Sequence, residues 1–509
     1  MLEYLPKRRR VGGLRIDPHK SDSTSKPIEE GFIPDRLFIP VEPHRGTTPR
    51  CLVHRGQHVL RGQKLAIGQP GSGIADVHAS SSGQVAEVIE LEQQTTSGPT
   101  RISCIVIDTD GRDECMPASI AADSNSATRP ELLELVRESG IVGLGGAAVS
   151  TSWKLDRSDS LRTLIINGAE CEPYISCDDM LMREEASGIL AGSLDICNII
   201  EAERCIVAIE RDKPRAIAAI REAAKDFDDP RLNLAELPSI YPAGGECQLI
   251  ELLIGREVPT GRFPSDIGIV CQNVATALAV HQALSTGAPL VSRVVTVTGG
   301  GVAAPRNVRV RIGTMISDLI AHCGGYTDAA SALIIGGSMM GIAQRTDDIP
   351  VAKGTNCVIV AGAQDAPTPG REWPCIRCGE CAGACPARLL PQELLRAADS
   401  NNFSLLDTLG LDDCIECGCC DAVCPSHIAL TSRFVRARRL VDRKRQADEF
   451  SADSQSRYES RTQRLAQLDE HEQESQRALL ASLETEEERK AAIRAALERV
   501  ARRKPNGDT

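Results

Sequence analysis

Two cysteine runs decide the fold of this chain: CIRCGECAGACP at residues 375–386 and CIECGCCDAVCP at residues 414–425. In each run two residues separate the first cysteine from the second, two separate the second from the third, and three precede a fourth that is followed by proline. This is the spacing of bacterial ferredoxins, in which three cysteines of one short loop bind one [4Fe-4S] cluster. The repeat therefore predicts a ferredoxin-like domain with two [4Fe-4S] clusters.

The fourth cysteine of each run is expected to bind the cluster of the other run, as in two-cluster ferredoxins. Zinc is the alternative metal, because cysteines two residues apart also suit zinc ribbons. The repetition and the prolines Pro386 and Pro425 favour clusters. Cys419 lies outside the repeat and is predicted to be a bystander. The two expected ligand sets are Cys375, Cys378, Cys381 with Cys424, and Cys414, Cys417, Cys420 with Cys385.

The composition excludes several classes of protein. A net charge of -12 argues against a nucleic-acid-binding role, which needs a concentrated cationic surface. Twenty cysteines without a secretory signal point to metal or redox chemistry in a reducing compartment, and not to disulfides. Because no stretch approaches the length of a membrane span, we expect a cytoplasmic protein or one bound peripherally to a membrane through partners.

With 509 residues the chain is too long for one core, so several domains are expected. Short β-rich pieces broken by glycine give way to helices alternating with apolar strands, and then to further strands. The expected parts are an N-terminal arm (1–30), a small β barrel or sandwich (31–125), an α/β sheet domain (126–290), a small α+β module (291–365), the ferredoxin-like domain (366–430) and a charged helical tail (431–509).

Four polar or glycine-rich loops within residues 140–276 indicate a nucleotide-type site. The first contains Gly143, Gly145 and Gly146, whose backbone amides can approach a phosphate, with Lys154 as the counter-charge. A second loop follows the expected strand at 161–166. Ligands bind beyond the carboxyl ends of strands in open α/β sheets. The side chains expected there are Asn167, Glu170 and Glu172, and the other two loops are residues 241–246 and 271–276.

With these motifs, residues 12–436 resemble the RnfC family of the Rnf (Rsx) ion-translocating electron transport complex, and the middle is similar to the flavin-binding subunit of respiratory complex I. The resemblance implies a Rossmann-like α/β domain that binds FMN and accepts a hydride from NADH. It also implies a β-grasp-like (SLBB) module. The expected location is the cytoplasmic side of the inner membrane, and the expected partners are the other Rnf subunits, NAD(H) and, indirectly, ferredoxin or flavodoxin.

The resemblance also assigns roles within the nucleotide-type site. Glu170 and Glu172 are implied to lie toward NADH, and no catalytic acid or base is expected. The implied FMN contacts are Gly143, Gly145, Gly146, Lys154, Asn167, Glu246, Asn273 and Thr276.

The chain departs from the family pattern within this site. Residues 146–151 read GAAVST, whereas the family usually has Gly-Ala-Gly-Phe-Pro-Thr. Val149 lacks the aromatic face that would stack on a nicotinamide or flavin, and Ala148 stands where backbone approach favours glycine. The alternative function is therefore an electron relay whose nucleotide site has decayed.

Overall fold

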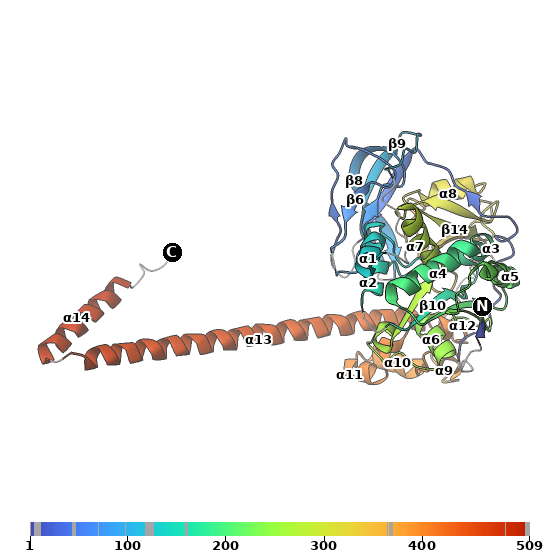
Figure 1. Ribbon diagram of the computed structural model, residues 1–509. Helices are drawn as coiled ribbons and strands as arrows, with labels where there is room; N and C mark the ends of the chain where they lie inside the picture. Colours follow the sequence, from blue (N-terminus) through green and yellow to red (C-terminus); the bar gives the residue numbers. More distant parts are fainter. Residues whose placement is uncertain are drawn as a thin grey trace. The chain divides into compact units, whose positions relative to one another are not determined.

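The computed structural model describes residues 2–4, 12–42, 47–69, 71–96, 98–117, 127–157, 161–363, 365, 370–483 and 485–503 (Figure 1). Three parts of the expected domain division lie outside these residues: most of the arm before residue 12, the boundary at 125/126 and the domain start at 366. The chain forms two compact units, Met1–Ala437 and Arg438–Thr509, each of which is described by itself.

The β-rich module consists of two antiparallel sheets. One has the strand order β3-β9-β8-β5 and the other β4-β6-β7. Their inward faces share an apolar core that contains Leu37, Val59, Leu65, Val85 and Ile105. The strands are β3 (Arg36–Val41), β4 (Arg50–Cys51), β5 (His58–Val59), β6 (Lys64–Ile67), β7 (Val77–His78), β8 (Gly83–Thr95) and β9 (Gly98–Thr109). This arrangement is the barrel-sandwich expected from the sequence.

The α/β domain contains a five-stranded parallel sheet with the order β1-β12-β11-β10-β13. Its central strands are apolar on both faces, as parallel strands covered by helices require. The strands are β1 (Leu2–Tyr4), β10 (Thr163–Gly168), β11 (Arg204–Glu210), β12 (Leu232–Leu237) and β13 (Ile269–Asn273). The edge strand β1 belongs to the expected N-terminal arm, so this part of the arm extends the sheet.

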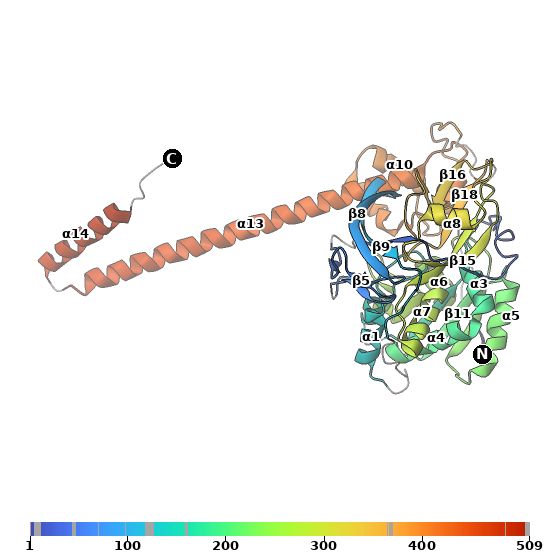
Figure 2. The same ribbon diagram turned by 90° about the horizontal axis from the view of Figure 1, so that it is seen from above.

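Helices cover both faces of this sheet. One face packs on α6 through Ile165, Ile206 and Leu249. The opposite face packs on the remaining long helices, of which α4 and α7 lie side by side in both views (Figures 1 and 2). The helices are α1 (Arg129–Glu138), α2 (Thr151–Leu155), α3 (Cys177–Glu184), α4 (Ala186–Ile200), α5 (Pro214–Ala223), α6 (Glu246–Ile254) and α7 (Val274–Thr286), with 3-10 turns η1 (Ala224–Asp226) and η2 (Pro264–Ile267).

The module after the α/β domain is a six-stranded sheet with the order β17-β16-β18-β14-β15-β2. Its core is a separate cluster that includes Val295, Val308, Leu319 and Val358. The elements are β2 (Glu29–Glu30), β14 (Ser292–Thr298), β15 (Arg306–Arg311), α8 (Ile316–His322), β16 (Ala332–Ile335), β17 (Ile342–Gln344) and β18 (Cys357–Ala361). The β2 strand comes from the N-terminal arm and pairs with β15.

The two cysteine runs form short helices and loops with little regular structure. Gly379 and Gly418 precede the two run helices and have φ values of 83° and 73°, which glycine adopts without strain. The helices are α9 (Glu380–Ala384), α10 (Pro391–Asp399), α11 (Phe403–Thr408) and α12 (Cys419–Ala422), with the 3-10 turn η3 (Leu411–Asp413). The mixed fold class predicted from the sequence is confirmed.

The second unit is helical, as expected for the tail. It contains most of α13 (Leu430–Ala481) and all of α14 (Glu486–Arg503). Its apolar side chains are largely exposed, for example Phe450 and Tyr458 at 74% and 71%. Among the described residues, none of the helices combines the length and the apolar character that a membrane crossing requires.

Candidate functional site

Four cysteines from the two runs line one cavity. Cys375, Cys378 and Cys381 of the first run meet Cys424 of the second run there, beside Leu395. We call these four cysteines the outer set, because Cys375 and Cys378 are exposed. The structure thus brings together the ligand set that the interleaved pattern predicts.

The other four predicted ligands line a second cavity. Cys414, Cys417 and Cys420 meet Cys385 of the first run there, beside Phe434. We call these four the inner set, because Cys385, Cys417 and Cys420 are each less than a tenth exposed. Cys419 also lines this cavity and is fully buried.

The donor chemistry of both sets fits a [4Fe-4S] cluster. Burial raises the pKa of Cys381, Cys385 and Cys420 above the usual thiol range. Thiolates grouped in such a place need a compensating cation, which iron supplies. The Leu389 N–H donates to Cys385 Sγ at 3.3 Å, a contact typical of sulfur that ligates a cluster.

A cleft of about 590 Å³ lies at the carboxyl ends of the parallel strands, a volume within the usual range of cofactor sites. The strands β10 and β13 end at its edge, at Gly168 and Asn273. Nine of the ten residues predicted to contact a cofactor line it. They are Gly143, Gly145, Gly146, Lys154, Asn167, Glu170, Glu172, Glu246 and Asn273.

Thr276 is the predicted contact that does not reach the cleft. Its side chain is fully buried, and its Oγ1 accepts a hydrogen bond from the Leu144 N–H at 2.9 Å. Leu144 lies between the loop glycines Gly143 and Gly145. Thr276 therefore holds the glycine loop from behind.

Lys154 is held over the cleft by two acceptors. Its Nζ donates to Glu246 Oε1 at 2.6 Å and to the Cys271 carbonyl oxygen at 2.7 Å. The amine is on the short helix α2, and about 30% of the side chain is exposed. A half-buried cation beside glycine amides suits a phosphate group.

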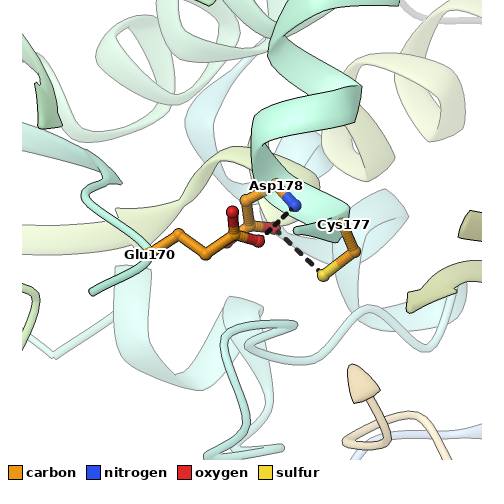
Figure 3. Close-up of side chains that lie close together, drawn as sticks. All are labelled: Glu170, Cys177 and Asp178. Carbon is orange, nitrogen blue, oxygen red and sulfur yellow. Dashed lines mark hydrogen bonds between the residues drawn. The ribbon is translucent and has the colours of Figure 1, made fainter. Parts of the chain in front are cut away.

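Glu170 is a buried carboxylate at the start of helix α3. Its Oε1 accepts from the Asp178 N–H at 2.7 Å (Figure 3). Its Oε2 accepts from the Asp179 N–H at 3.2 Å. Burial raises its pKa to about 7, with a further rise from the charge of Asp178. Cys177 Sγ and an Asp178 oxygen lie near the same carboxylate (Figure 3). Both Glu170 oxygens are used to cap α3.

Glu172 joins the cleft to the six-stranded module. Its Oε1 accepts from the N–H groups of Met339 and Met340 at 2.7 and 2.8 Å. Burial raises its pKa despite these two hydrogen bonds. A side chain at Gly337 would overlap Glu172, since a Cβ there would lie 1.7 Å from Glu172 Cγ. The loop at 336–341 thus forms one wall of the cleft.

The residues that depart from the family pattern lie outside the cleft. Ala148 lines a separate cavity that also contains residues of the β-rich module, and Val149 is in neither lining. Ala148 has a φ of 49°, a left-handed conformation that costs a non-glycine residue about 1 kcal/mol. The loop keeps this strained conformation, and the glycines Gly145 and Gly146 remain at the cleft.

The cleft and the inner set share a wall. Ile415, which follows Cys414, lines the cleft, and so does Tyr241. The Tyr241 hydroxyl donates to the Cys417 carbonyl oxygen at 2.7 Å. Tyr241, Cys417 and Cys419 belong to one apolar cluster against which Cys171 and Met339 pack. A dry contact of this kind suits electron transfer between the two sites.

Sequence reasoning did not name several residues that line the cleft. Those from other domains are Gly336, Gly337, Met340, Gly341 and Asn356 of the six-stranded module and Ile415 of the second cysteine run. The glycine-rich segment GGSMMG at 336–341 is a readable signal for the first four. Cys171 and Tyr241 lie within two of the loops that the sequence singles out, although neither was named as a contact.

Four family models match the chain. They are the RnfC barrel sandwich hybrid domain at residues 9–112, the Nuo51 FMN-binding domain at 136–282, the SLBB domain at 294–343 and the 4Fe-4S dicluster domain at 374–428. The FMN-binding match contains all nine predicted residues that line the cleft, from Gly143 to Asn273. The dicluster match contains all eight predicted ligands.

Curated relatives are similar over most of the chain. A protein of Pseudomonas aeruginosa, named as the C component of an ion-translocating oxidoreductase complex, is 41% identical over 90% of this chain and 59% of its own length. A protein of Klebsiella pneumoniae with the same name is 38% identical over 96% of this chain and 64% of its own length. The chain thus spans about three fifths of these relatives' length.

A solved structure of an NAD+-reducing [NiFe]-hydrogenase in the H2-reduced state is also similar. It aligns with 62% of this chain and 61% of that chain, at 19% identity and a TM-score of 0.44. A likeness at this level carries no argument about function.

Proposed function

The chain is a homologue of the RnfC proteins of ion-translocating oxidoreductase complexes, and from this premise we propose that it is the peripheral electron-transfer subunit of such a complex. In this proposal it relays electrons between NADH and the membrane subunits of the complex, at the cytoplasmic side of the inner membrane. Ferredoxin or flavodoxin is the more distant redox partner. The protein exchanges electrons and carries out no acid–base step.

One observation supports this function most strongly: the cleft and the cysteine sets are contiguous. Ile415 and Tyr241 line the cleft and also contact the inner set, through the chain at Cys414 and the hydrogen bond to Cys417. The runs interleave, because each set contains one cysteine of the other run. A path therefore leads from the cleft through the inner set to the exposed outer set.

When bound, FMN would supply hydride acceptance and the two [4Fe-4S] clusters would supply one-electron transfer. The chain's own residues bind and orient these groups. Gly143, Gly145 and Gly146 leave room for close backbone approach, and Lys154 supplies positive charge for a phosphate. Asn167 is held by its own hydrogen bond to the Gly244 carbonyl oxygen at 2.8 Å. Glu170 and Glu172 line the side assigned to NADH and hold its walls in place through their backbone hydrogen bonds, to the start of α3 and to the loop at 336–341.

A relay without a working nucleotide site is the second candidate. Val149 favours it, because the chain offers no aromatic face where the family has one. The open cleft favours the first candidate, because Ala148 and Val149 do not line it. Nine of the predicted contact residues line the cleft, which also favours the first candidate.

Anaerobic titration of the reconstituted protein with NADH separates the two candidates. The first predicts bound FMN, bleaching of the flavin absorbance bands and subsequent reduction of the clusters. Bound clusters with no bound FMN and no bleaching would instead establish the relay. A protein that holds neither clusters nor FMN would overturn both candidates.

A further inference from the structure

The N-terminal strap, residues 12–30, crosses the molecule between the two redox sites. Its first residues contact the first cysteine run: the Gly13 N–H donates to the Ala384 carbonyl oxygen at 2.8 Å. The next residue pairs with the wall of the cleft. Leu14 N–H donates to the Tyr241 carbonyl oxygen at 2.8 Å, and Tyr241 N–H donates back to the Leu14 carbonyl oxygen at 2.9 Å.

Gly12 lies directly against a predicted ligand of the inner set. A Cβ at Gly12 would be 2.4 Å from the Cys385 carbonyl oxygen and 3.1 Å from Pro386 N. The residue has a φ of 76°, which a side chain adopts only with strain. Leu14 and Ile16 pack against the apolar cluster that contains Tyr241 and Cys417. The start of the strap therefore fixes the inner set against the cleft.

The middle of the strap holds the carboxylate loop of the cleft. Lys20 Nζ donates to the Glu170 carbonyl oxygen and lies 3.5 Å from Glu170 Oε2. The Lys20 and Glu170 side chains are only 10% and 3% exposed, so this ion pair is buried. The Tyr174 N–H donates to the Pro18 carbonyl oxygen at 2.9 Å, and His19 stacks on the Tyr174 ring at 4.7 Å.

The far end of the strap is anchored in the α/β domain and in the six-stranded module. Ser23 Oγ and Ser176 Oγ are 2.7 Å apart, and the Ile28 N–H donates to Glu184 Oε1 at 2.9 Å. The strap then continues into β2, which pairs with β15. The strap is therefore held at both ends, by the first cysteine run at Gly13 and by β15 at Glu29–Glu30.

We propose that the strap positions the two redox sites relative to each other, with Gly12 to Leu14 locating the inner set and Lys20 locating Glu170. The inference rests on the proposed function, because it assigns a cluster to the inner set and FMN to the cleft. It makes Gly12, Leu14 and Lys20 positioning residues. Strap residues act on the redox groups through Cys385, Tyr241 and Glu170.

The first test is Gly12→Ala in the full chain with both cofactors loaded. The added Cβ displaces the strap from Cys385. Gly71→Ala is the matched control, because Gly71 has a φ of 77° and no atom within 4 Å of an added Cβ. The readout is the midpoint potential and paramagnetic spectrum of each cluster in a redox titration.

The strap proposal predicts that Gly12→Ala shifts the potential and spectrum of the inner cluster alone. The outer cluster is the internal reference, and Gly71→Ala leaves both clusters unchanged. Two equally shifted clusters, or two unshifted ones, would overturn the strap proposal while leaving the proposed function intact. A wild-type protein without clusters would overturn the proposed function itself.

A second variant, Lys20→Met, tests the other end and does not depend on the first. It removes the buried cation beside Glu170 and keeps the length of the side chain. We expect a higher NADH concentration for half-maximal bleaching of the flavin bands, with FMN content and both clusters unchanged. Lys26→Met, at an exposed strap lysine, is the control and should behave as wild type. Equal NADH dependence in both variants would overturn the role of Lys20.

Discussion

The two cysteine runs have the same spacing but opposite surroundings. The inner set is buried and lies at the wall of the cleft, where Ile415 separates Cys414 from the cleft. The outer set lies at the surface, where Ile376 beside Cys375 is 68% exposed. In the proposed function, these equal ligand patterns serve two roles, one toward the cofactor in the cleft and one toward a partner. The difference comes from the surrounding domains and is absent from the runs themselves.

Removing one ligand from each set should give the largest difference between the inner and the outer cluster. Cys417→Ala and Cys378→Ala should each lose half of the cluster iron, since each removes one cluster. In Cys378→Ala, NADH should still reduce the inner cluster through the cleft. In Cys417→Ala, NADH should no longer reduce the outer cluster. Rapid-freeze paramagnetic spectra after mixing with NADH measure both effects.

The surplus cysteine supplies the control for these two variants. Cys419→Ala should retain all of the iron, because Cys419 lies outside the repeated spacing. If Cys417→Ala and Cys378→Ala gave the same spectra, the assignment of an inner and an outer cluster would be wrong.

The interleaving of the runs can be tested with the two fourth cysteines. Cys424→Ala should alter the outer cluster and resemble Cys378→Ala, because Cys424 lines the outer cavity. Cys385→Ala should alter the inner cluster and resemble Cys417→Ala. Paramagnetic spectra of the reduced variants decide the pairing. The opposite pairing would show that each run binds its own cluster.

Lys154→Met measures how much the phosphate-facing cation contributes to the FMN affinity of the cleft. Loss of one charge-assisted contact corresponds to about 1.5–3 kcal/mol, or roughly a ten- to hundredfold weaker FMN affinity. Flavin fluorescence on dilution measures the affinity, and the iron content should not change. Lys225→Met is the control, because Lys225 is an exposed lysine that pairs with Glu222 close by in the chain. An unchanged affinity would place the phosphate elsewhere.

The smallest expected effect is a pH dependence carried by Glu170. Burial raises the pKa of Glu170 from 4.5 to about 7 in the folded state, so the folded chain holds this proton more tightly than the unfolded chain. The contribution of Glu170 to stability is present below its unfolded pKa and is lost as the pH rises toward about 7. Glu170→Gln should flatten this part of the curve of thermal midpoint against pH. Parallel curves for the two proteins would contradict the raised pKa.

How much the sequence predicts differs between the two kinds of site. The cluster ligands follow from local spacing, so Cys375 to Cys424 could be assigned without any structure. The cleft follows from strand order, because Asn167 and Asn273 end neighbouring parallel strands. Gly337 and Ile415 were not predicted because they reach the cleft from other domains, the six-stranded module and the second cysteine run. The family resemblance implies Thr276 as an FMN contact, and the structure places its buried side chain behind the glycine loop, where it accepts from the Leu144 N–H.

The N-terminal region is a second case in which contacts between distant residues cannot be predicted from the sequence. The sequence predicts only an N-terminal arm at residues 1–30, whose polar residues around Lys20 show no apolar period. In the structure, Lys20 is buried because it pairs with Glu170, a residue 150 positions away. A buried lysine paired over such a distance leaves no periodic signal in the sequence.

In the proposed function, two interleaved sets of four cysteines each hold a four-iron cluster, and the inner cluster lies beside an FMN cleft. Iron, acid-labile sulfide and flavin should be measured per chain in anaerobically purified protein, with a paramagnetic spectrum after dithionite reduction. The account predicts equal iron and sulfide sufficient for two clusters, one FMN and two interacting reduced signals. Zinc in place of iron, or a silent spectrum after reduction, would contradict it.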